Sequence, residues 1–350
     1  MFKRLVRKPL FWLGFAYIFL WLAGSFVYAA TFHNHIPTAD LRYGSAGQLV
    51  DRPPYPPWEF PPLGTDDFSQ NIFIVLLIGA KFTLGLALLC ALLRTVLSAL
   101  IGILTRLYLP KITRVLFAPF ESLSYFPIAL LLYLILQWVL FKDASLHQDH
   151  FTYGFWTRTW IDMLFLTLIA VPLTTRTIFN ETGGFLKKPF IESATVLGAS
   201  RLQLFWRHLR PFLFPRLFVI FMREVVQVLL LMAHLGVFKV AIGGIIMKEN
   251  LFTASSSLRF PYALANDWAG LIGVWWRYIW TDYQYITFVP IIAVTLAILA
   301  VKGISVSVEA VLGQREEHSS ARKRDGDLSQ SVGMAKTDDF TPTGFSQEGI

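Results

Sequence analysis

Long apolar runs alternate with short polar and basic segments along the 350-residue chain. The runs lie at about residues 9–30, 72–107, 115–141, 160–178, 212–238 and 285–301. An α-helix needs roughly 20 residues, with a range of about 17–25, to cross the hydrocarbon core of a bilayer, and each run is long enough to contain one such span. The pattern therefore predicts an all-α polytopic membrane protein with six transmembrane helices.

The first run follows a basic start, Lys3, Arg4, Arg7 and Lys8, and stays uncharged over residues 9–30. A signal peptide begins in a similar way, but its apolar core is usually about 7–15 residues long. We interpret residues 1–30 as a basic segment and a retained first transmembrane helix. Because small residues follow the run, a cleaved signal peptide is the alternative.

Residues 31–71 are polar and rich in proline, including the stretch DRPPYPPWEFPP. Irregular backbone of this kind cannot lie exposed in lipid, because its polar groups would lack hydrogen-bond partners. Each proline also restricts its own backbone and that of the preceding residue. We expect a stiff external loop that leads into a core of five further helices, residues 72–313.

Two later segments depart from the pattern of simple spans. Residues 239–284 contain Gly243, Gly244 and many aromatic residues, which favour the membrane interface. This segment holds either a re-entrant helix or a helix that lies on the surface. Residues 314–350 are polar and are expected to form a disordered cytoplasmic tail.

Composition supports this class and assigns an orientation. Only 15% of the residues are charged and mean hydropathy is +0.52, whereas soluble domains carry roughly 25% charged residues. Lysine and arginine collect on the cytoplasmic side of inserted helices, which accounts for the formal net charge of +8 without nucleic-acid binding. Both termini are then cytoplasmic, together with the basic clusters at residues 3–8, 106–114 and 176–210, and from Lys302 onward.

The chain contains no motif for catalysis or for a resident cofactor. The patterns G-x-x-x-x-G-K-[ST], H-E-x-x-H and G-x-S-x-G do not occur. Cys90 is the only cysteine, which excludes a disulfide or a cysteine-based zinc framework within the chain. His147 and His150 have no third ligand nearby and are interpreted as surface residues. The expectation is a protein that is not an enzyme and holds no metal.

Three ionisable residues lie within predicted spans: Arg94, Arg223 and Glu224. Such residues usually face a partner or a water-filled cavity, because a charge in lipid is costly. Adjacent helical residues point about 100° apart, so Arg223 and Glu224 need not pair with each other. All three are candidates for a substrate pathway. For Arg94 the alternative is a long, shifted helix that places this residue near the inner interface.

The cytoplasmic segment from Arg176 to Pro211 reads RTIFNETGGFLKKPFIESATVLGASRLQLFWRHLRP. The Gly183-Gly184 pair is expected to break the fourth helix, and Pro189 is suited to begin a new one. A short amphipathic helix, a turn at Ala199-Ser200 and a second amphipathic stretch should follow. Pro211 would then mark the start of the fifth span.

Small residues within this segment, Ser193, Ala194, Gly198 and Ala199, leave little side-chain bulk. Another protein could approach closely there. The alternative is an ordinary amphipathic connector between two spans.

The stretch ESATVLGASRLQLFWRHLRP resembles the EAA loop, E-A-A-x-x-x-G, of bacterial ABC-importer permeases. Residues 61–84, PPLGTDDFSQNIFIVLLIGAKFTL, are similar to a segment of the dipeptide, oligopeptide and nickel permeases with a long first external loop. The spacings of Glu121 to Pro127, and of Arg176 and Glu181 to Glu192, also resemble that family, as does the sequence NDWAG at residues 266–270. The chain departs from the family pattern at Ser193, Arg210 and residues 69–71.

The resemblance implies a type I ABC-importer permease fold, with residues 72–313 as the permease core. It also implies roles for individual residues. Those that would couple the loop to an ATPase are Glu192, Ser193, Ala194, Gly198, His208 and Pro211. Those that would support the loop are Arg176, Glu181 and Arg207.

The resemblance further implies that this chain works with other proteins in a bacterial plasma (inner) membrane. Separate ATP-binding subunits would hold ATP and magnesium, so no cofactor is expected in this chain. A second permease subunit would complete the pore, surrounded by membrane lipid, and an external substrate-binding protein would deliver the substrate. Peptides are the expected cargo. The alternatives are nickel, opines or sugars, or a non-transporting membrane scaffold or sensor subunit.

Overall fold

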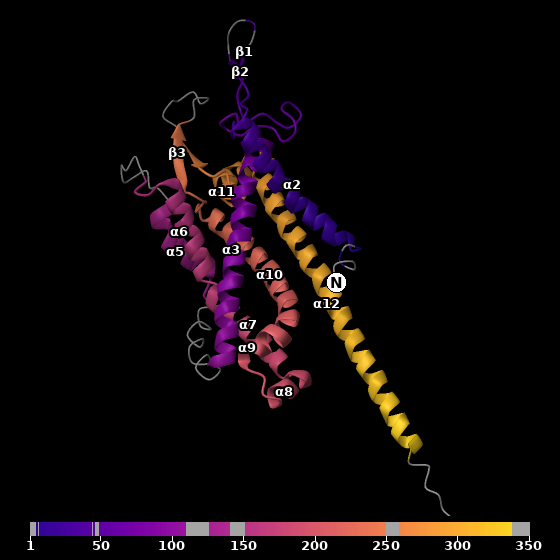
Figure 1. Cartoon of the computed structure of the whole chain (residues 1–350). Helices are drawn as coiled ribbons and strands as arrows, with labels where there is room; N and C mark the ends of the chain where they lie inside the picture. Colours follow the sequence, from indigo (N-terminus) through magenta and orange to yellow (C-terminus); the bar gives the residue numbers. More distant parts are fainter. Residues whose placement is uncertain are drawn as a thin grey trace, which may run out of the picture.

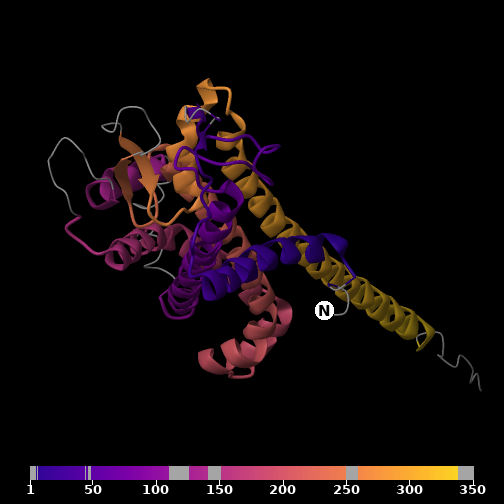
Figure 2. The ribbon, with the colours of Figure 1, turned by 90° about the horizontal axis from the view of Figure 1, so that it is seen from above.

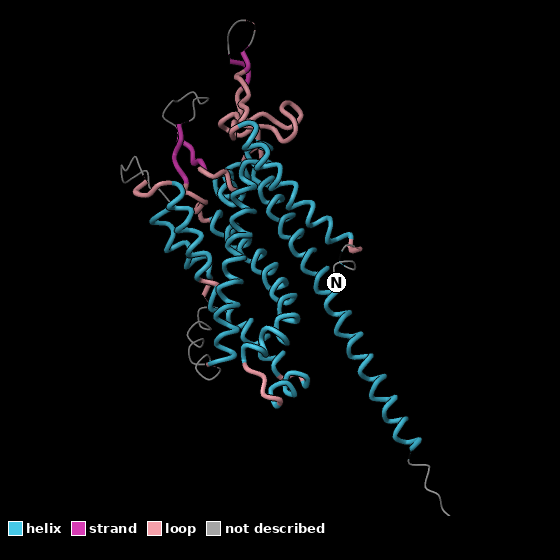
Figure 3. Tube along the Cα trace, viewed as in Figure 1, coloured by secondary structure: helices cyan, strands magenta, loops and turns pink. Residues whose placement is uncertain are grey.

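The computed structural model describes residues 5, 7–43, 45, 49–109, 126–140, 151–249 and 259–337, with side chains described as far as residue 313. The described chain is mostly helical, and its few short strands gather at one end (Figure 3). Five helical segments are long and apolar enough to cross a membrane: Pro9–Phe32, Ile72–Tyr108, Phe155–Leu186, Arg201–Val237 and Tyr285–Gly313. These segments support the prediction of an all-α polytopic membrane protein.

The third predicted span is described only in part. Its described portion is helix α5, Ile128–Leu140, an apolar helix of 13 residues. The preceding residues 110–125, which include Glu121, lie outside the described residues, as do His147 and His150. A total of six spans therefore stays a prediction.

Helix α3, Ile72–Tyr108, lies at the centre of the bundle (Figure 1). Its first turn is capped by Asn71, whose side chain accepts hydrogen bonds from the backbone N–H groups of Phe73 and Ile74. Helix α2, Pro9–Phe32, packs against it, and Ser25 donates a hydrogen bond to the carbonyl of Ile78 at 3.3 Å. The two helices are thus joined within the apolar layer.

Helix α12, Tyr285–Thr337, packs along α2 and α10, Arg210–Val237. Tyr17 of α2 donates a hydrogen bond of 2.9 Å to the carbonyl of Ala293 in α12. Seen from above, α12 and the pair α5 and α6, Phe155–Leu168, lie on opposite sides of the molecule (Figure 2). The backbone of α12 is helical to Thr337, so it continues past residue 313, where the sequence predicts a disordered tail. No proline interrupts residues 291–337, which allows the helix to continue.

The segment 239–284 folds into a hairpin and a short helix. Strands β3, Ile245–Glu249, and β4, Arg259–Ala263, are antiparallel, with Ile245 opposite Ala263 and Glu249 opposite Arg259. Helix α11, Trp268–Trp275, follows, and a 3₁₀ helix, η3, spans Trp276–Trp280. All eight residues of α11 are buried, so this helix lies inside the bundle rather than on its surface.

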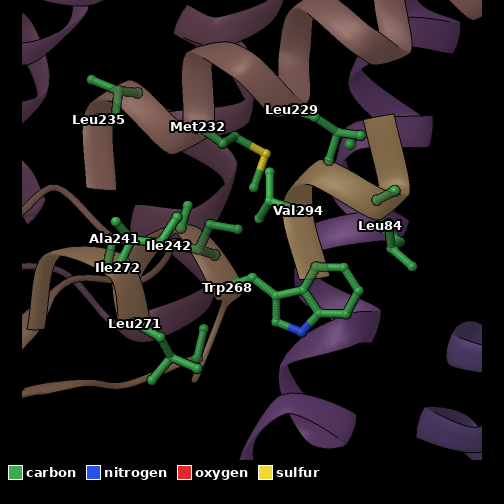
Figure 4. Packing of buried hydrophobic residues seen from close by; sticks show 14 of the residues in the cluster. Leu84, Leu229, Met232, Leu235, Ala241, Ile242, Trp268, Leu271, Ile272 and Val294 are labelled. Atoms are coloured by element: carbon green, nitrogen blue, oxygen red, sulfur yellow. The ribbon is translucent and has the colours of Figure 1, made fainter. Parts of the chain in front are cut away.

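Trp268 anchors α11 among the spans (Figure 4). Its indole N–H donates to the carbonyl of Leu76, and its backbone N–H donates to the hydroxyl of Thr83, both at 2.8 Å. Its ring is fully buried in an apolar cluster with Leu84 of α3, Met232 of α10 and Val294 of α12. Helix α11 therefore joins three spans through one aromatic side chain.

The loop between α2 and α3, predicted to be external, is folded in part. It carries a small hairpin of β1, Arg42–Tyr43, and β2, Leu49–Asp51. Tyr55 of the proline-rich stretch is 1% exposed, and its carbonyl accepts a hydrogen bond of 3.1 Å from the hydroxyl of Tyr285. The loop is thereby tied to the start of α12.

The fourth span differs from its predicted form. It consists of α6 and α7, Val171–Leu186, and the Gly183-Gly184 pair lies within α7. The prediction that these glycines break the helix is wrong. A methyl group at Gly183 would lie 2.6 Å from the guanidinium carbon of Arg106, so glycine serves here for close approach. The helix ends instead at Leu186, three residues before Pro189.

Glycines also allow α11 to enter the bundle. A methyl group at Gly79 of α3 would overlap the carbonyl oxygen of Asn266, whereas one at Gly85 of the same helix would meet open space. We expect Gly79→Ala to destabilise the protein by about 1–3 kcal/mol, because overpacking forces a backbone shift. Thermal unfolding of the detergent-solubilised protein measures the effect. Gly85→Ala is the matched control, and equal melting temperatures for the two variants would contradict this packing.

Candidate functional site

The segment predicted to contact another protein forms two short helical pieces at one end of the bundle (Figure 1). Helix α8, Pro189–Val196, begins with a proline in its first turn, as the sequence predicts. A turn leads to α9, Arg201–Gln203, and to a π-helical stretch, η2, Leu204–Leu209. The chain then continues directly into α10.

Helix α8 is held to the bundle along one side only. Ile191 is 1% exposed and packs in a cluster with Phe185, Leu204, Leu209 and Leu213. Ala194 is half-buried against the same cluster, whereas Glu192 and Ser193 are exposed. The predicted residues therefore lie on both faces of α8, and the acidic face points away from the protein.

The turn after α8 exposes two apolar side chains. Val196 and Leu197 are each 87% exposed. Gly198 has φ of 85°, a left-handed conformation that favours glycine, and a methyl group there would meet open space. The turn is closed by Ser200, which forms a capping box with Gln203 at 3.1 and 3.3 Å. Local sequence thus fixes an apolar tip that the rest of the described chain leaves uncovered.

The connection to the fifth span contains the remaining predicted residues. Arg207 is exposed and His208 is half-buried in η2, and Pro211 is in the first turn of α10. Pro211 has no N–H for the carbonyl of Arg207, and the N–H of Arg210 bonds to the carbonyl of Phe205 in a wider ring. The proline therefore accounts for the π-helical geometry at this junction.

Arg176 and Glu181 lie on α7, both half-buried. Glu181 faces an open groove of about 540 Å³ between α7 and α10. The other lining residues include Thr177, Asn180, Phe185, Lys188 and Arg216. The groove carries both signs of charge close to α8.

Arg94 and Glu224 are brought together in the interior of the bundle. Arg94 is 0% exposed, and its Nη1 lies 3.3 Å from Oε2 of Glu224. The other carboxylate oxygen accepts a hydrogen bond of 2.7 Å from the hydroxyl of Thr174. Arg223 is exposed on the other side of α10, so the two adjacent charges face different surroundings, as the helical geometry predicts.

The same arginine also satisfies the backbone where α6 and α7 are interrupted. The backbone N–H of Ala170 donates a hydrogen bond of 3.3 Å to the carbonyl of Thr167 instead of to the carbonyl of Leu166. Arg94 donates through Nε, at 2.9 Å, and through Nη2 to the Leu166 carbonyl. In a low-dielectric interior an unsatisfied carbonyl is costly, so this contact stabilises the interruption.

Two neighbours of Arg94 on the same face of α3 act in a similar way. Cys90 and Ser98 are spaced four residues before and after it, and their side chains lie 3.9 Å and 3.1 Å from the carbonyls of Met163 and Val171. Residues four apart on a helix share a face. This stripe of donors follows α6 and α7 through the bundle.

Sequence reasoning missed a second set of buried ionisable residues. Arg158 and Asp162 of α6 are each 4% exposed, and Asp267 before α11 is 0% exposed. Within the described residues, Asp162 Oδ1 and the Arg158 Nε and Nη1 atoms have no hydrogen-bond partner. The sequence contains a signal for this site, because an acidic residue such as Asp162 is unusual within an apolar span.

The loop between α2 and α3 carries a further polar cluster, at residues 66–70. Asp66 is 3% exposed, and its Oδ1 accepts backbone hydrogen bonds from Phe68, at 3.0 Å, and Gln70, at 2.9 Å. Its neighbour Asp67 forms an ion pair with Arg277 of η3. The cluster joins the first external loop to the segment that precedes α12.

Burial sets the ionisation of this cluster. Loss of solvation, together with the nearby Asp67 carboxylate, raises the pKa of Asp66 to about 7, while its backbone hydrogen bonds and Arg277 oppose the shift. Burial also raises the pKa of Tyr278, whose hydroxyl accepts a hydrogen bond of 3.1 Å from the backbone of Asp67.

No protein-family model matches this chain, and no curated protein matches it. The resemblance to ABC-importer permeases therefore stays a prediction from the sequence.

The stability of the external loop should depend on pH. The folded chain holds a proton on Asp66 up to about pH 7, whereas the ordinary value is 3.8. The folded state thus binds more protons over this window, and its stability falls as pH rises through it. Asp66→Asn keeps the accepting oxygen without the charge, so we expect protection of residues 60–72 from hydrogen exchange to become independent of pH.

Hydrogen exchange at about pH 5 and about pH 8, corrected for the intrinsic rates, measures this effect. The exposed Asp282 provides the control variant Asp282→Asn. If residues 60–72 of the wild-type protein were equally protected at both pH values, the raised pKa of Asp66 would be contradicted.

Proposed function

We propose that this chain is the transmembrane permease subunit of an ABC importer for peptides in a bacterial plasma membrane. A separate ATPase subunit would bind α8 and drive alternating access, and a second permease subunit would complete the pore. The observation that carries this proposal is the exposed apolar tip of Val196 and Leu197 beside the small residue Gly198.

The tip has the properties of a docking surface. Contiguous exposed apolar patches mark sites where another protein or a membrane surface binds, and Val196 and Leu197 are adjacent and equally exposed. Helix α8 is held by the buried Ile191, and the turn after it is closed by the Ser200–Gln203 capping box of α9, so neither contact involves the side chains of the tip. A groove on another protein could therefore cover Val196 and Leu197 without rearrangement of the bundle.

The position of α8 supports energy coupling rather than cargo recognition. Helix α8 and the external loop lie at opposite ends of the bundle (Figure 1). The α8 end carries the basic cluster of residues 176–210, which the distribution of charge assigns to the cytoplasm. An ATPase would reach α8 from inside, while the substrate-binding protein would reach the external loop from outside.

The substrate class rests on the resemblance of residues 61–84 to the peptide permeases. The buried polar cluster of Asp66 and its neighbours lies in this segment and gives it a defined fold at the outer end. Nickel, opines and sugars are alternative cargoes of the same machinery. A scaffold or sensor subunit is the alternative from another class.

An acidic residue at the tip should disrupt docking without unfolding the chain. We expect Val196→Asp to weaken association with the ATPase at least about ten-fold, because an apolar contact would be replaced by a buried charge. The measurement is substrate-stimulated ATP hydrolysis by the complex purified from native membranes. Gly198→Trp should abolish the same activity while leaving membrane insertion intact.

Val50→Asp is the matched control, because Val50 is 64% exposed in the external hairpin at the opposite end. It should leave the stimulated rate unchanged. An ATPase rate that is also unchanged by Val196→Asp and by substitution of Glu192 would favour the scaffold alternative. The absence of any co-purifying ATPase in mild detergent would have the same meaning.

A further inference from the structure

The fourth span is interrupted near its middle, at Ile169–Ala170. Pro172 cannot donate a backbone hydrogen bond, and α6 ends at Leu168 before α7 begins at Val171. An interruption of this kind is a natural point for bending, because Ala170 bonds to Thr167 instead of Leu166 and Pro172 has no N–H to donate. Helices α6 and α7 can therefore change their relative angle without breaking either helix.

A single polar cluster bridges this interruption. Arg94 of α3 holds the carbonyl of Leu166, on the α6 side, with two N–H groups. The same guanidinium contacts Glu224 of α10, which accepts a hydrogen bond from Thr174, on the α7 side. Four helices thus meet at one charge pair, and both sides of the interruption are bound to it.

Helix α8 packs against the end of α7 and against η2, which continues into α10. Phe185, near the end of α7, packs with Ile191 of α8 and with Leu213 of α10 in one apolar cluster. The groove of about 540 Å³ separates α7 from α10 between the polar cluster and α8. A tilt of α7 about the interruption would close or widen this groove and move α8 with it.

We propose that Arg94, Glu224 and Thr174 form a latch on a hinge at Ile169–Ala170. While the latch is closed, α7 moves as one body with α3 and α10. When the carboxylate of Glu224 releases both Arg94 and Thr174, α7 loses this polar link to α3 and α10 and can tilt together with α8. The consequence for transport rests on the proposed function, whereas the hinge itself does not.

Interspin distances in the detergent-solubilised full chain test the latch. Labels at Leu164 and Asn180 report the angle between α6 and α7, and labels at Asn180 and Phe214 report the width of the groove. The three side chains, Leu164, Asn180 and Phe214, are all exposed. The background variant is Cys90→Ala, because Cys90 is the only cysteine.

Substitution of Arg94 and substitution of Glu224 should change the interspin distances in different ways. Arg94→Met removes both contacts, so each label pair should gain a second population of about a tenth of the molecules or more. Glu224→Gln leaves the Leu166 carbonyl capped by Arg94. It should therefore change only the Asn180–Phe214 distances.

Ser98→Ala is the matched control. It removes a buried hydrogen bond from α3 to the carbonyl of Val171 without touching α10, and it should leave both distributions as in the parent. A second population of equal size in Ser98→Ala would overturn the proposal, since loosened packing alone would then suffice. Parent-like distances in folded Arg94→Met would also overturn it.

If Arg94→Met does not accumulate in the membrane, the variants Glu224→Gln and Arg94→Lys test the latch instead. A parent-like Asn180–Phe214 distribution in Glu224→Gln overturns the latch, and a shifted one that Arg94→Lys does not share supports it. None of these measurements needs an ATPase or a substrate. A failed latch therefore leaves the docking proposal standing, and a failed docking proposal leaves the latch standing.

Discussion

The fold of this bundle depends on the backbone carbonyl of Leu166, which needs a hydrogen-bond partner in the interior of a membrane protein. Water cannot satisfy a backbone group there, so a helix can be interrupted only where another group supplies the missing hydrogen bond. Arg94 does so, and its charge in turn requires Glu224. Loss of one partner from such a buried pair typically costs about 3–5 kcal/mol. The interruption, the position of α3 and the rotation of α10 are consequently interdependent.

The loops at the two ends of the bundle are stabilised in different ways. The α8 loop is specified by local signals, since Pro189, Gly198 and the Ser200 capping box all lie within the loop itself. The external loop depends on distant partners, because Asp67 meets Arg277 and Tyr55 meets Tyr285. A locally folded loop can be moved as a unit, whereas the external loop is joined to the first turns of two spans.

This difference explains which features could be predicted from the sequence. The spans follow from hydropathy, and α8 follows from Pro189 and the amphipathic pattern after it. Arg94 and Glu224 could be identified as unusual, but their pairing depends on how α3 and α10 are rotated, 130 residues apart. Gly183 was misinterpreted because its effect comes from Arg106 on another helix. The burial of Asp162 likewise depends on tertiary packing, which one sequence does not reveal.

The small helix α11 has a consequence for biogenesis. With eight residues, it is too short to enter a bilayer as an independent span, and its Trp268 requires the carbonyl of Leu76, 192 residues earlier in the chain. Its place also needs α12, which is synthesised after it. During translation α11 can therefore reach its buried position only after α12 has been synthesised. Closure of the bundle around α11 is then a late step of assembly, after insertion and distinct from it.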